Sequence, residues 1–394
     1  MKKCSFLLVL VILIFCCSSQ KESPKGKSRI QVIDGVKIIH NSKEGMWQHQ
    51  AKDLNLEPNL VIGINEDDEN YILYEPVDID ADSKGNIYIL DIKASIIKKY
   101  DSQGKYVKTI GRKGEGPGDL LEPLNMFIDF KDIIYVNDAG NKRISIFDEM
   151  GEFLHSFKLK KYLDNFSIDK NGNFITEEYA IDSDTNPHEI RRVVEINKYS
   201  PKFEFLSNLF RGSYSSSQIL NIGDQYFTVS VPYVNKPYWA IDPGGNICIG
   251  SSEKYVINVF DPNEKLIMKI IKDCNPSHVT NEDKNKILDE AFSLEPDNEI
   301  NRLRHEQIRK KLKFPNKKPV LGGFIFDERG YLLVGVYEKC QSGFQAFDLF
   351  DEQGRYLKKL CLSSIPMLFK NGNAYGLSYS STSIQAIRYC IIDP

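Results

Sequence analysis

The chain has 394 residues, of which 41% are hydrophobic and 11% aromatic, so it can fill a large core and is too apolar for a disordered chain. Its 51 basic and 54 acidic residues give a net charge of −3. No basic run is long enough to neutralise a row of phosphates, so the composition argues against a nucleic-acid partner.

The first predicted element is a signal peptide. Lys2 and Lys3 precede an apolar run from Phe6 to Phe15. A helix of that length spans roughly 15 Å, about half of a membrane core, so a retained anchor is a weaker alternative. The cysteines that follow resemble a bacterial lipobox, with Cys17 as the better lipid acceptor because small Cys16 precedes it. We expect a signal peptide at 1–17 and lipidation of Cys17; cleaved secretion without a lipid is the other alternative.

Residues 18–30 are rich in Lys and Ser and contain few apolar side chains. Such a segment buries too little surface to fold, so we expect a flexible tether. The remaining chain, 31–394, is predicted to be one folded domain that hangs a short way from the membrane.

An internal repeat then organises the chain. Four copies, at 77–91, 165–178, 238–250 and 323–335, have an apolar strand, an Asp-x-x-Gly turn and a second apolar strand, and two degenerate copies lie at 125–138 and 367–378. The intervals from Gly85 to Lys131, from Lys131 to Gly172 and from Gly330 to Gly372 fit the period of about 40–45 residues of a four-stranded blade. The pattern predicts an all-β, six-bladed β-propeller.

Two longer intervals separate the remaining copies. Residues 217–231 form an additional hairpin that either extends the third blade or forms a blade of its own, which leaves a seven-bladed propeller as the alternative. Residues 279–312 are rich in helix formers with apolar residues at helical spacing, so they predict a helical insertion over one face. Two spare N-terminal strands, 36–41 and 59–64, are candidates to complete the last blade and close the ring.

Five cysteines lie outside the signal segment. Cys248, Cys274, Cys340, Cys361 and Cys390 are odd in number, and several occupy apolar strands. We interpret them as buried free thiols, with a disulfide as an alternative whose partners the sequence does not name.

The segment 137–157, NDAGNKRISIFDEMGEFLHSF, resembles the NHL repeat. Together with 109–123, TIGRKGEGPGDLLEP, it is similar to a six-bladed β-propeller family of bacterial envelope lipoproteins. Asp138, Asn141 and Arg143 match the NHL signature and are expected to tie a loop by hydrogen bonds. Related propellers include metal-dependent lactonases and a peptide-amidating lyase, but a fold does not transfer an activity.

Three groups of residues are candidate sites. The Gly-rich loop 111–119, with Arg112 and Glu115, could bind an anion or serve only as a crossover between blades. Asp78 and Asp80 alternate along one strand and could bind a divalent cation such as calcium in the channel, although the EF-hand pattern fails. Tyr238 and Trp239 open an inner strand and could stack a sugar or peptide at the propeller mouth.

No catalytic motif stands out: the histidines form no pair at metal-ligand spacing, and no nucleophile elbow occurs. The sequence therefore predicts a lipid-anchored protein of the cell envelope, on the periplasmic side or the cell surface, that binds or scaffolds a protein, peptide or glycan. The insertion would act as lid or docking element, and no cofactor is required. The alternative is a metal-dependent hydrolase or lyase that uses Asp78 and Asp80.

Overall fold

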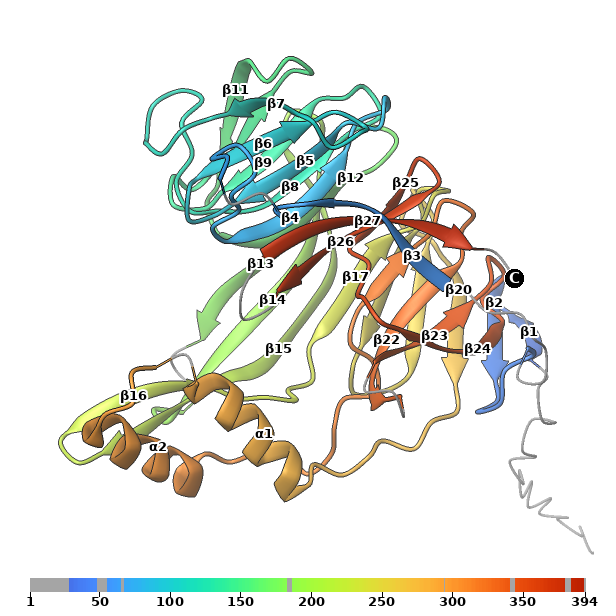
Figure 1. Cartoon of the computed structure of the whole chain (residues 1–394). Coiled ribbons are helices and arrows are strands. Elements are labelled where there is room, and N and C mark those ends of the chain that lie inside the picture. The colour runs from blue at the N-terminus through green and yellow to red at the C-terminus, as the bar shows by residue number, and fades with distance from the viewer. Residues whose placement is uncertain are drawn as a thin grey trace, which may run out of the picture.

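The computed structural model describes residues 28–47, 55–64, 67–182, 186–293, 295–340, 344–379 and 384–392. In these ranges the strands form six sheets, which are the blades of a propeller (Figure 1). The six-bladed prediction is confirmed, and the seven-bladed alternative is wrong because the hairpin at 217–231 belongs to the sheet of blade 3. Cys17, the signal segment and residues 18–27 of the tether lie outside the described residues.

Each blade begins with its innermost strand. Blade 1 consists of β4 (Pro76–Ala81), β5 (Ile87–Asp91), β6 (Ile96–Tyr100) and β7 (Tyr106–Ile110). Blade 2 consists of β8 (Pro123–Ile128), β9 (Ile134–Asp138), β10 (Arg143–Phe147) and β11 (Phe153–Lys158). Blade 3 consists of β12 (Tyr162–Ile168), β13 (Phe174–Asp182), β14 (Glu189–Tyr199), β15 (Phe205–Ile222) and β16 (Gln225–Ser230).

Blade 4 consists of β17 (Pro237–Ile241), β18 (Ile247–Ser251), β19 (Val256–Phe260) and β20 (Leu266–Lys272), followed by β2 (Val36–Asn41) and β1 (Arg29–Ile33). Blade 5 consists of β21 (Phe324–Phe326), β22 (Leu332–Lys339), β23 (Gln345–Phe350) and β24 (Tyr356–Leu362). Blade 6 consists of β25 (Leu368–Lys370), β26 (Asn373–Tyr379), β27 (Ile384–Ile392) and β3 (Asn55–Ile62).

The repeated Asp-x-x-Gly turns explain why the strands reverse where they do. In blade 1, Asp82 Oδ1 accepts hydrogen bonds from the backbone N–H groups of Lys84 (3.0 Å) and Asn86 (2.9 Å). Gly85 takes a φ of +78°, a value that favours glycine. Asp169, Asp242 and Asp327 accept bonds of the same kind in later blades. The sequence-level reading of these turns is therefore confirmed.

The N-terminal residues 28–47 and 55–62, which we call the strap, contact three successive blades. β3 pairs antiparallel with β27 and completes blade 6, as predicted for the segment that starts at Asn59. The spare strand at 36–41 has another place: as β2 it pairs parallel with β20, which extends blade 4. Between these strands, the N–H groups of Met46 and Trp47 donate to the carbonyls of Tyr356 (3.1 Å) and Leu357 (2.8 Å) in blade 5.

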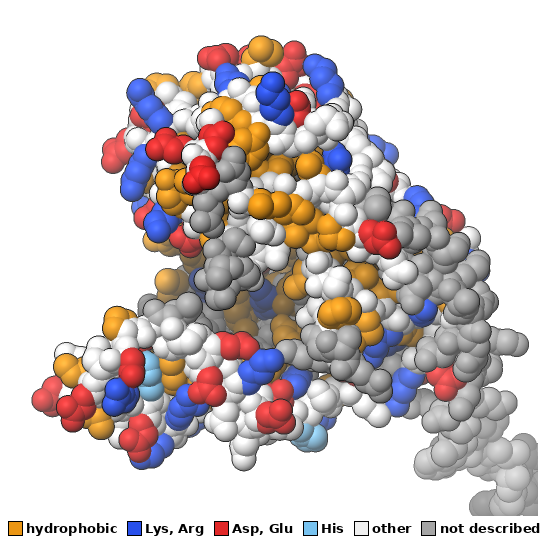
Figure 2. Space-filling model, in the orientation of Figure 1, with side chains coloured by type: hydrophobic (Ala, Val, Ile, Leu, Met, Phe, Trp, Pro, Cys, Tyr) orange, Lys and Arg blue, Asp and Glu red, His pale blue; other side chains and the backbone are white. Residues whose placement is uncertain are grey.

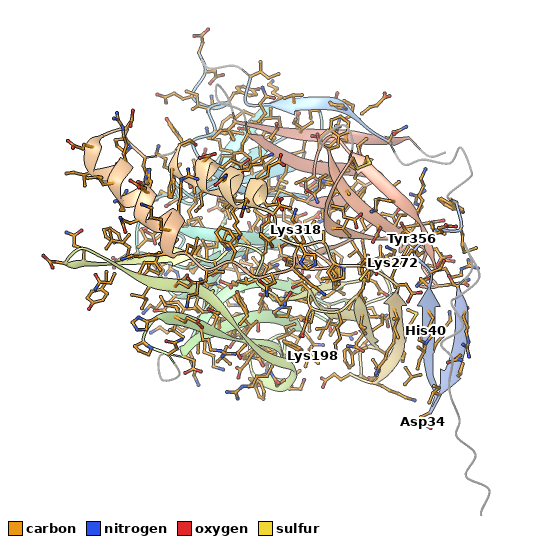
Figure 3. All side chains as sticks on the ribbon, turned by 90° about the horizontal axis from the view of Figure 1, so that it is seen from below. Asp34, His40, Lys198, Lys272, Lys318 and Tyr356 are labelled. Carbon is orange, nitrogen blue, oxygen red and sulfur yellow. A yellow bond between two sulfur atoms is a disulfide. The ribbon has the colours of Figure 1, made fainter. Side chains whose placement is uncertain are left out.

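Buried polar groups hold the strap between blades 4 and 5. The Asn41 amide donates to the carbonyls of Ile271 (3.3 Å) and Gly354 (3.0 Å), and its oxygen accepts from the Tyr356 N–H (2.8 Å). Beside it, Lys272 Nζ lies 3.0 Å from Asp348 Oδ2 and 4.4 Å from the ring centroid of Tyr356 (Figure 3). These contacts offset part of the desolvation cost of the buried groups, although Asp348 Oδ1 accepts no hydrogen bond among the described residues.

The predicted helical insertion is confirmed as two helices, α1 (Asn281–Phe292) and α2 (Glu299–Lys311). Thr280 and Asp283 cap α1 reciprocally. The helices pack on the far end of the β15–β16 hairpin through a shared apolar cluster of Leu220, Val231, Leu288, Ile308 and Leu312. Residues 217–231 and 281–312 together are called the arm, which projects from the ring (Figure 1). Within the described ranges, no helix is long and apolar enough to cross a membrane.

The cysteines differ in part from the expectation of free thiols. Cys340 and Cys361 form a disulfide within blade 5, with Cα atoms 6.0 Å apart. Sequence could not name this pair because β23 lies between the strands concerned. Cys248 is free and buried, Cys274 is free and partly buried, and the side chain of Cys390 lies outside the described ones.

Candidate functional site

The six innermost strands surround a channel cavity of about 900 Å³. All six begin at the same face of the ring, which we call the mouth face. The arm projects from this face, because its hairpin leads from blade 3 to the start of β17 and its helices lead from the end of β20 to the start of β21. Figure 2 shows a deep hollow between the ring and the arm. A channel cavity of this size is the natural place to look for a ligand site.

Asp78 and Asp80 lie in the channel wall on β4. The Asp78 carboxylate accepts from the backbone N–H groups of Ile79 (2.9 Å) and Met126 (2.8 Å). Burial raises the pKa of Asp78 to about 7, the bond from Met126 opposes this rise, and the nearby charge of Asp80 adds to it. Asp78 therefore connects the inner strands of blades 1 and 2.

Asp80 makes the corresponding link one step deeper in the channel. Its carboxylate accepts from the N–H groups of Ala81 (2.7 Å) and Ile128 (2.7 Å). Lys370 Nζ, from blade 6, lies 2.9 Å from Asp80 Oδ1 and donates to the Ile128 carbonyl at 2.9 Å. Burial raises the pKa of Asp80, and the Lys370 charge opposes the rise. Each oxygen of the two aspartates thus already accepts a hydrogen bond.

Charged and aromatic side chains gather where blades 3 and 4 meet the channel. The Trp239 indole N–H donates to Glu177 Oε2 at 2.9 Å, and Arg192 Nη1 donates to Asp164 Oδ2 at 3.2 Å. Lys236 immediately precedes β17 and lines the same cavity. We call Asp164, Glu177, Arg192, Lys236 and Trp239 the mouth cluster.

The electrostatics of the mouth cluster are those of a partly desolvated site. Burial raises the pKa of Glu177; the Trp239 indole lowers it, while the charge of Asp164 raises it further. Burial likewise raises the pKa of Asp164, against the opposing charges of Arg192 and Lys236. Together the carboxylates of the mouth cluster offer acceptors, and its guanidinium, ammonium and indole groups offer donors, which suits a ligand rich in hydroxyl or amide groups.

Tyr238 points to the other side of β17, toward blade 5. Its hydroxyl lies 3.5 Å from the hydroxyl of Tyr337, and its ring lies 6.4 Å from that of Phe324. Tyr233 meets the same Tyr337 ring edge-on at 5.7 Å. Adjacent residues on β17 therefore face different seams: Trp239 belongs to the mouth cluster, and Tyr238 belongs to an aromatic group between blades 4 and 5.

The structure does not bring Arg112 and Glu115 to this site, because they lie on the loop between blades 1 and 2. The loop is closed on itself: Arg112 Nε donates to Asp119 Oδ1 at 2.7 Å, and the Glu115 carbonyl accepts from Arg143. Asp138 accepts from Arg143 (2.7 Å) and from Asn141 (2.9 Å). These bonds match the predicted role of Asp138, Asn141 and Arg143 in tying a loop.

Among the described residues, no three His, Cys, Asp or Glu side chains are arranged to hold a metal ion. Sequence reasoning missed Asp164, Glu177, Arg192 and Lys236. They come from four separate segments of blades 3 and 4 and form no motif. The available signal was positional, since Asp164 and Lys236 lie at the starts of inner strands.

Residues 81–244 match the model of the DUF5128 family, described as a 6-bladed beta-propeller. A protein from Bacteroides fragilis described as exported has 12% identity and a TM-score of 0.47, with 89% of this chain and 99% of that chain covered. A duf4221 family member from Bacteroides vulgatus has 10% identity and a TM-score of 0.49, over 87% and 99%. Virginiamycin B lyase from Staphylococcus aureus has 10% identity and a TM-score of 0.43, over 86% and 100%. No curated protein matches the chain.

Proposed function

We propose that this propeller is an exported, lipid-anchored binding protein that takes a polar ligand, a peptide or a glycan, into the mouth of its channel. The observation that carries the proposal is the mouth cluster, in which Trp239 and three charged side chains, Asp164, Glu177 and Lys236, border a cavity of about 900 Å³, and Arg192 pairs with Asp164 beside them. Aromatic surface with a few convergent polar groups is the usual composition of a ligand site.

The alternative, a metal-dependent hydrolase or lyase built on Asp78 and Asp80, gains no support from their contacts. Their carboxylate oxygens accept backbone N–H groups, and a cation at Asp80 would meet the Lys370 ammonium group 2.9 Å from the carboxylate. Like charges at such a distance repel strongly inside a protein. The geometry favours a role for both aspartates in joining blades.

The chain carries a convenient reporter, because it has only two tryptophans, Trp47 and Trp239. In Trp47→Phe, Trp239 is the sole tryptophan. We expect its emission to shift when oligopeptides or neutral oligosaccharides that bind are titrated into the protein, because a ligand would change the polarity around the indole and its bond to Glu177.

The matched control is Trp239→Phe, in which Trp47 in the strap is the sole tryptophan and should not respond. Calorimetry on the same probes gives affinities, which Trp239→Ala should weaken roughly tenfold or more if the ring stacks on the ligand. Equal affinities in the parent and Trp239→Ala proteins would refute the proposed position of the site.

The anchor rests on the sequence alone and has its own test. The full chain expressed in a bacterium should incorporate a labelled fatty acid, and Cys17→Ser should abolish incorporation. Labelling that survives in Cys17→Ser would contradict the assignment. The NHL resemblance and the location in the cell envelope are likewise proposals that rest on the sequence.

A further inference from the structure

A second cavity, of about 850 Å³, lies on the mouth face over blades 1, 2 and 3. Its walls come from the turns that follow β5 and β9, the loops that lead into β8 and β12, and the end of β13. It shares no lining residue with the channel cavity. We call it the lysine pocket, after its five lysines: Lys93, Lys113, Lys142, Lys160 and Lys161.

The charge of this pocket is opposite to that of the chain as a whole. Five lysines and only two acids, Glu75 and Glu122, line it, whereas the chain carries a net charge of −3. All five lysines are exposed. Cations gathered around a concave wall reinforce one another's potential and attract an anion.

Among the described residues, four of these five ammonium groups have no side-chain partner. Lys161 pairs with Glu195. For Lys93, Lys113, Lys142 and Lys160, the part of the chain that the structure describes supplies no side-chain hydrogen bond or ion pair. Lysines with a purely structural role would be expected to meet a nearby carboxylate, as Lys161 does. These four are free to meet a carboxylate of a ligand.

The pocket also offers an aromatic platform. Tyr162 stacks on Tyr179 with ring centroids 5.2 Å apart and planes 16° apart, and the Arg192 guanidinium lies 4.2 Å from the centroid of Tyr179. Tyr162 is nevertheless 56% exposed, as is Ile181 beside it. A ring that is held on one face and open on the other suits the apolar face of a sugar ring.

From these observations we propose that the lysine pocket binds an acidic oligosaccharide. One sugar ring would stack on Tyr162. The carboxylates of the oligosaccharide would meet Lys93, Lys113, Lys142 and Lys160. A flat anionic membrane fits less well, because the charges line a concave wall rather than a plane. The inference goes beyond the proposed channel site. Because the two cavities share no lining residue, binding to one can be confirmed or refuted without binding to the other.

The test uses tetragalacturonate as an acidic probe, maltotetraose as a neutral one and tetraglutamate as an acidic peptide, each titrated by calorimetry into the mature domain. We expect tetragalacturonate to bind, with an affinity that falls as salt rises. Lys142→Gln with Lys160→Gln should weaken it roughly tenfold, and Tyr162→Ala should weaken it by a similar factor. The exposed pair Lys202→Gln with Lys254→Gln changes the net charge equally and should bind like the parent.

The outcomes are distinguishable from those of the channel site. Binding of tetragalacturonate should leave the emission of Trp239 unchanged, because that residue lines only the other cavity. Equal binding of maltotetraose, or an unchanged affinity in the Lys142→Gln, Lys160→Gln protein, would overturn the role of charge. If tetraglutamate binds more tightly than tetragalacturonate, and Tyr162→Ala does not weaken it, the ligand is an acidic peptide and the proposal is wrong. Absence of tetragalacturonate binding would also refute the proposal.

Discussion

Blades 1 and 2 differ sharply from blades 3 and 4, although all four derive from the same repeat. The first two have four strands each and short turns, whereas blade 3 has five strands, with β15 alone 18 residues long, and blade 4 has six. Both regions nevertheless join their blades through a buried acid: Asp80 accepts from the main chain of blade 2, and Glu177 of blade 3 accepts from Trp239 of blade 4. The ring is therefore held together in both regions, and the added strands and helices shape the surface.

If that division holds, removing the strap should have the largest effect. A chain that starts at residue 65 lacks β3, so β27 is left as an open edge and blade 5 loses the donors Met46 and Trp47. We expect the cooperative unfolding transition to disappear or the protein to aggregate, as seen by calorimetry and size-exclusion chromatography. The control is a chain that starts at residue 28, which should unfold at the same Tm as a chain that starts at residue 18. If the chain without the strap unfolds cooperatively at an unchanged Tm, the ring does not need closure by the strap.

Two matched core substitutions test whether the ring and the arm unfold as one unit. Leu90 in blade 1 is fully buried, and Leu288 in the arm is 5% exposed. Each change to Ala removes similar apolar contact and should destabilise the part of the molecule that contains it by about 3 kcal/mol. We expect Leu90→Ala to lower the global free energy of unfolding in denaturant, whereas Leu288→Ala should mainly speed hydrogen exchange in residues 217–231 and 281–311. Equal losses of global stability would mean that ring and arm form a single cooperative unit.

The smallest expected effect concerns the seam between blades 1 and 2. The pKa of Asp78 is raised from 3.8 to about 7 in the folded protein, so the folded state binds this proton more tightly than the unfolded chain does. The resulting stabilisation is complete below about pH 4 and is lost as the pH rises to about 7. Asp78→Asn should therefore remove roughly 2–3 kcal/mol of the fall in stability between pH 5 and pH 8. A variant whose Tm falls with pH as steeply as that of the parent would place the titration elsewhere.

Much of the fold could be predicted because its determinants are local. Asp82 and Gly85 lie within one turn, so the reversal can be read from four residues. The helical insertion also follows from periodicity and from the cap at Thr280. The place of β2 could not be predicted in the same way, since both spare N-terminal strands fit any open sheet edge. Contacts between distant segments, such as those of β2 with β20, decide among such edges.

The sites were less predictable than the fold. The sequence correctly predicts that Trp239 lies on an inner strand. Its partner Glu177 lies 62 positions away, and nothing in the sequence distinguishes it from other glutamates in strands. The lysine pocket draws on separate turns, and each of its lysines reads as an ordinary solvated side chain. What distinguishes them is that five lysines meet around one concave wall and that, among the described residues, only Lys161 has an ion-pair partner; spacing along the chain does not reveal either property.

The position of the strap has a consequence for how the protein is made. Asn41 and Tyr356 form a buried hydrogen bond across 315 positions of sequence. During synthesis the strap emerges before the blades that receive it, so β2 must wait for β20 of blade 4, and β3 must wait for β27, the last strand of blade 6. Pairings at such separations form slowly. We expect ring closure to be the final step of folding, and a nascent chain that stops short of blade 6 to present two unsatisfied strand edges to chaperones and proteases.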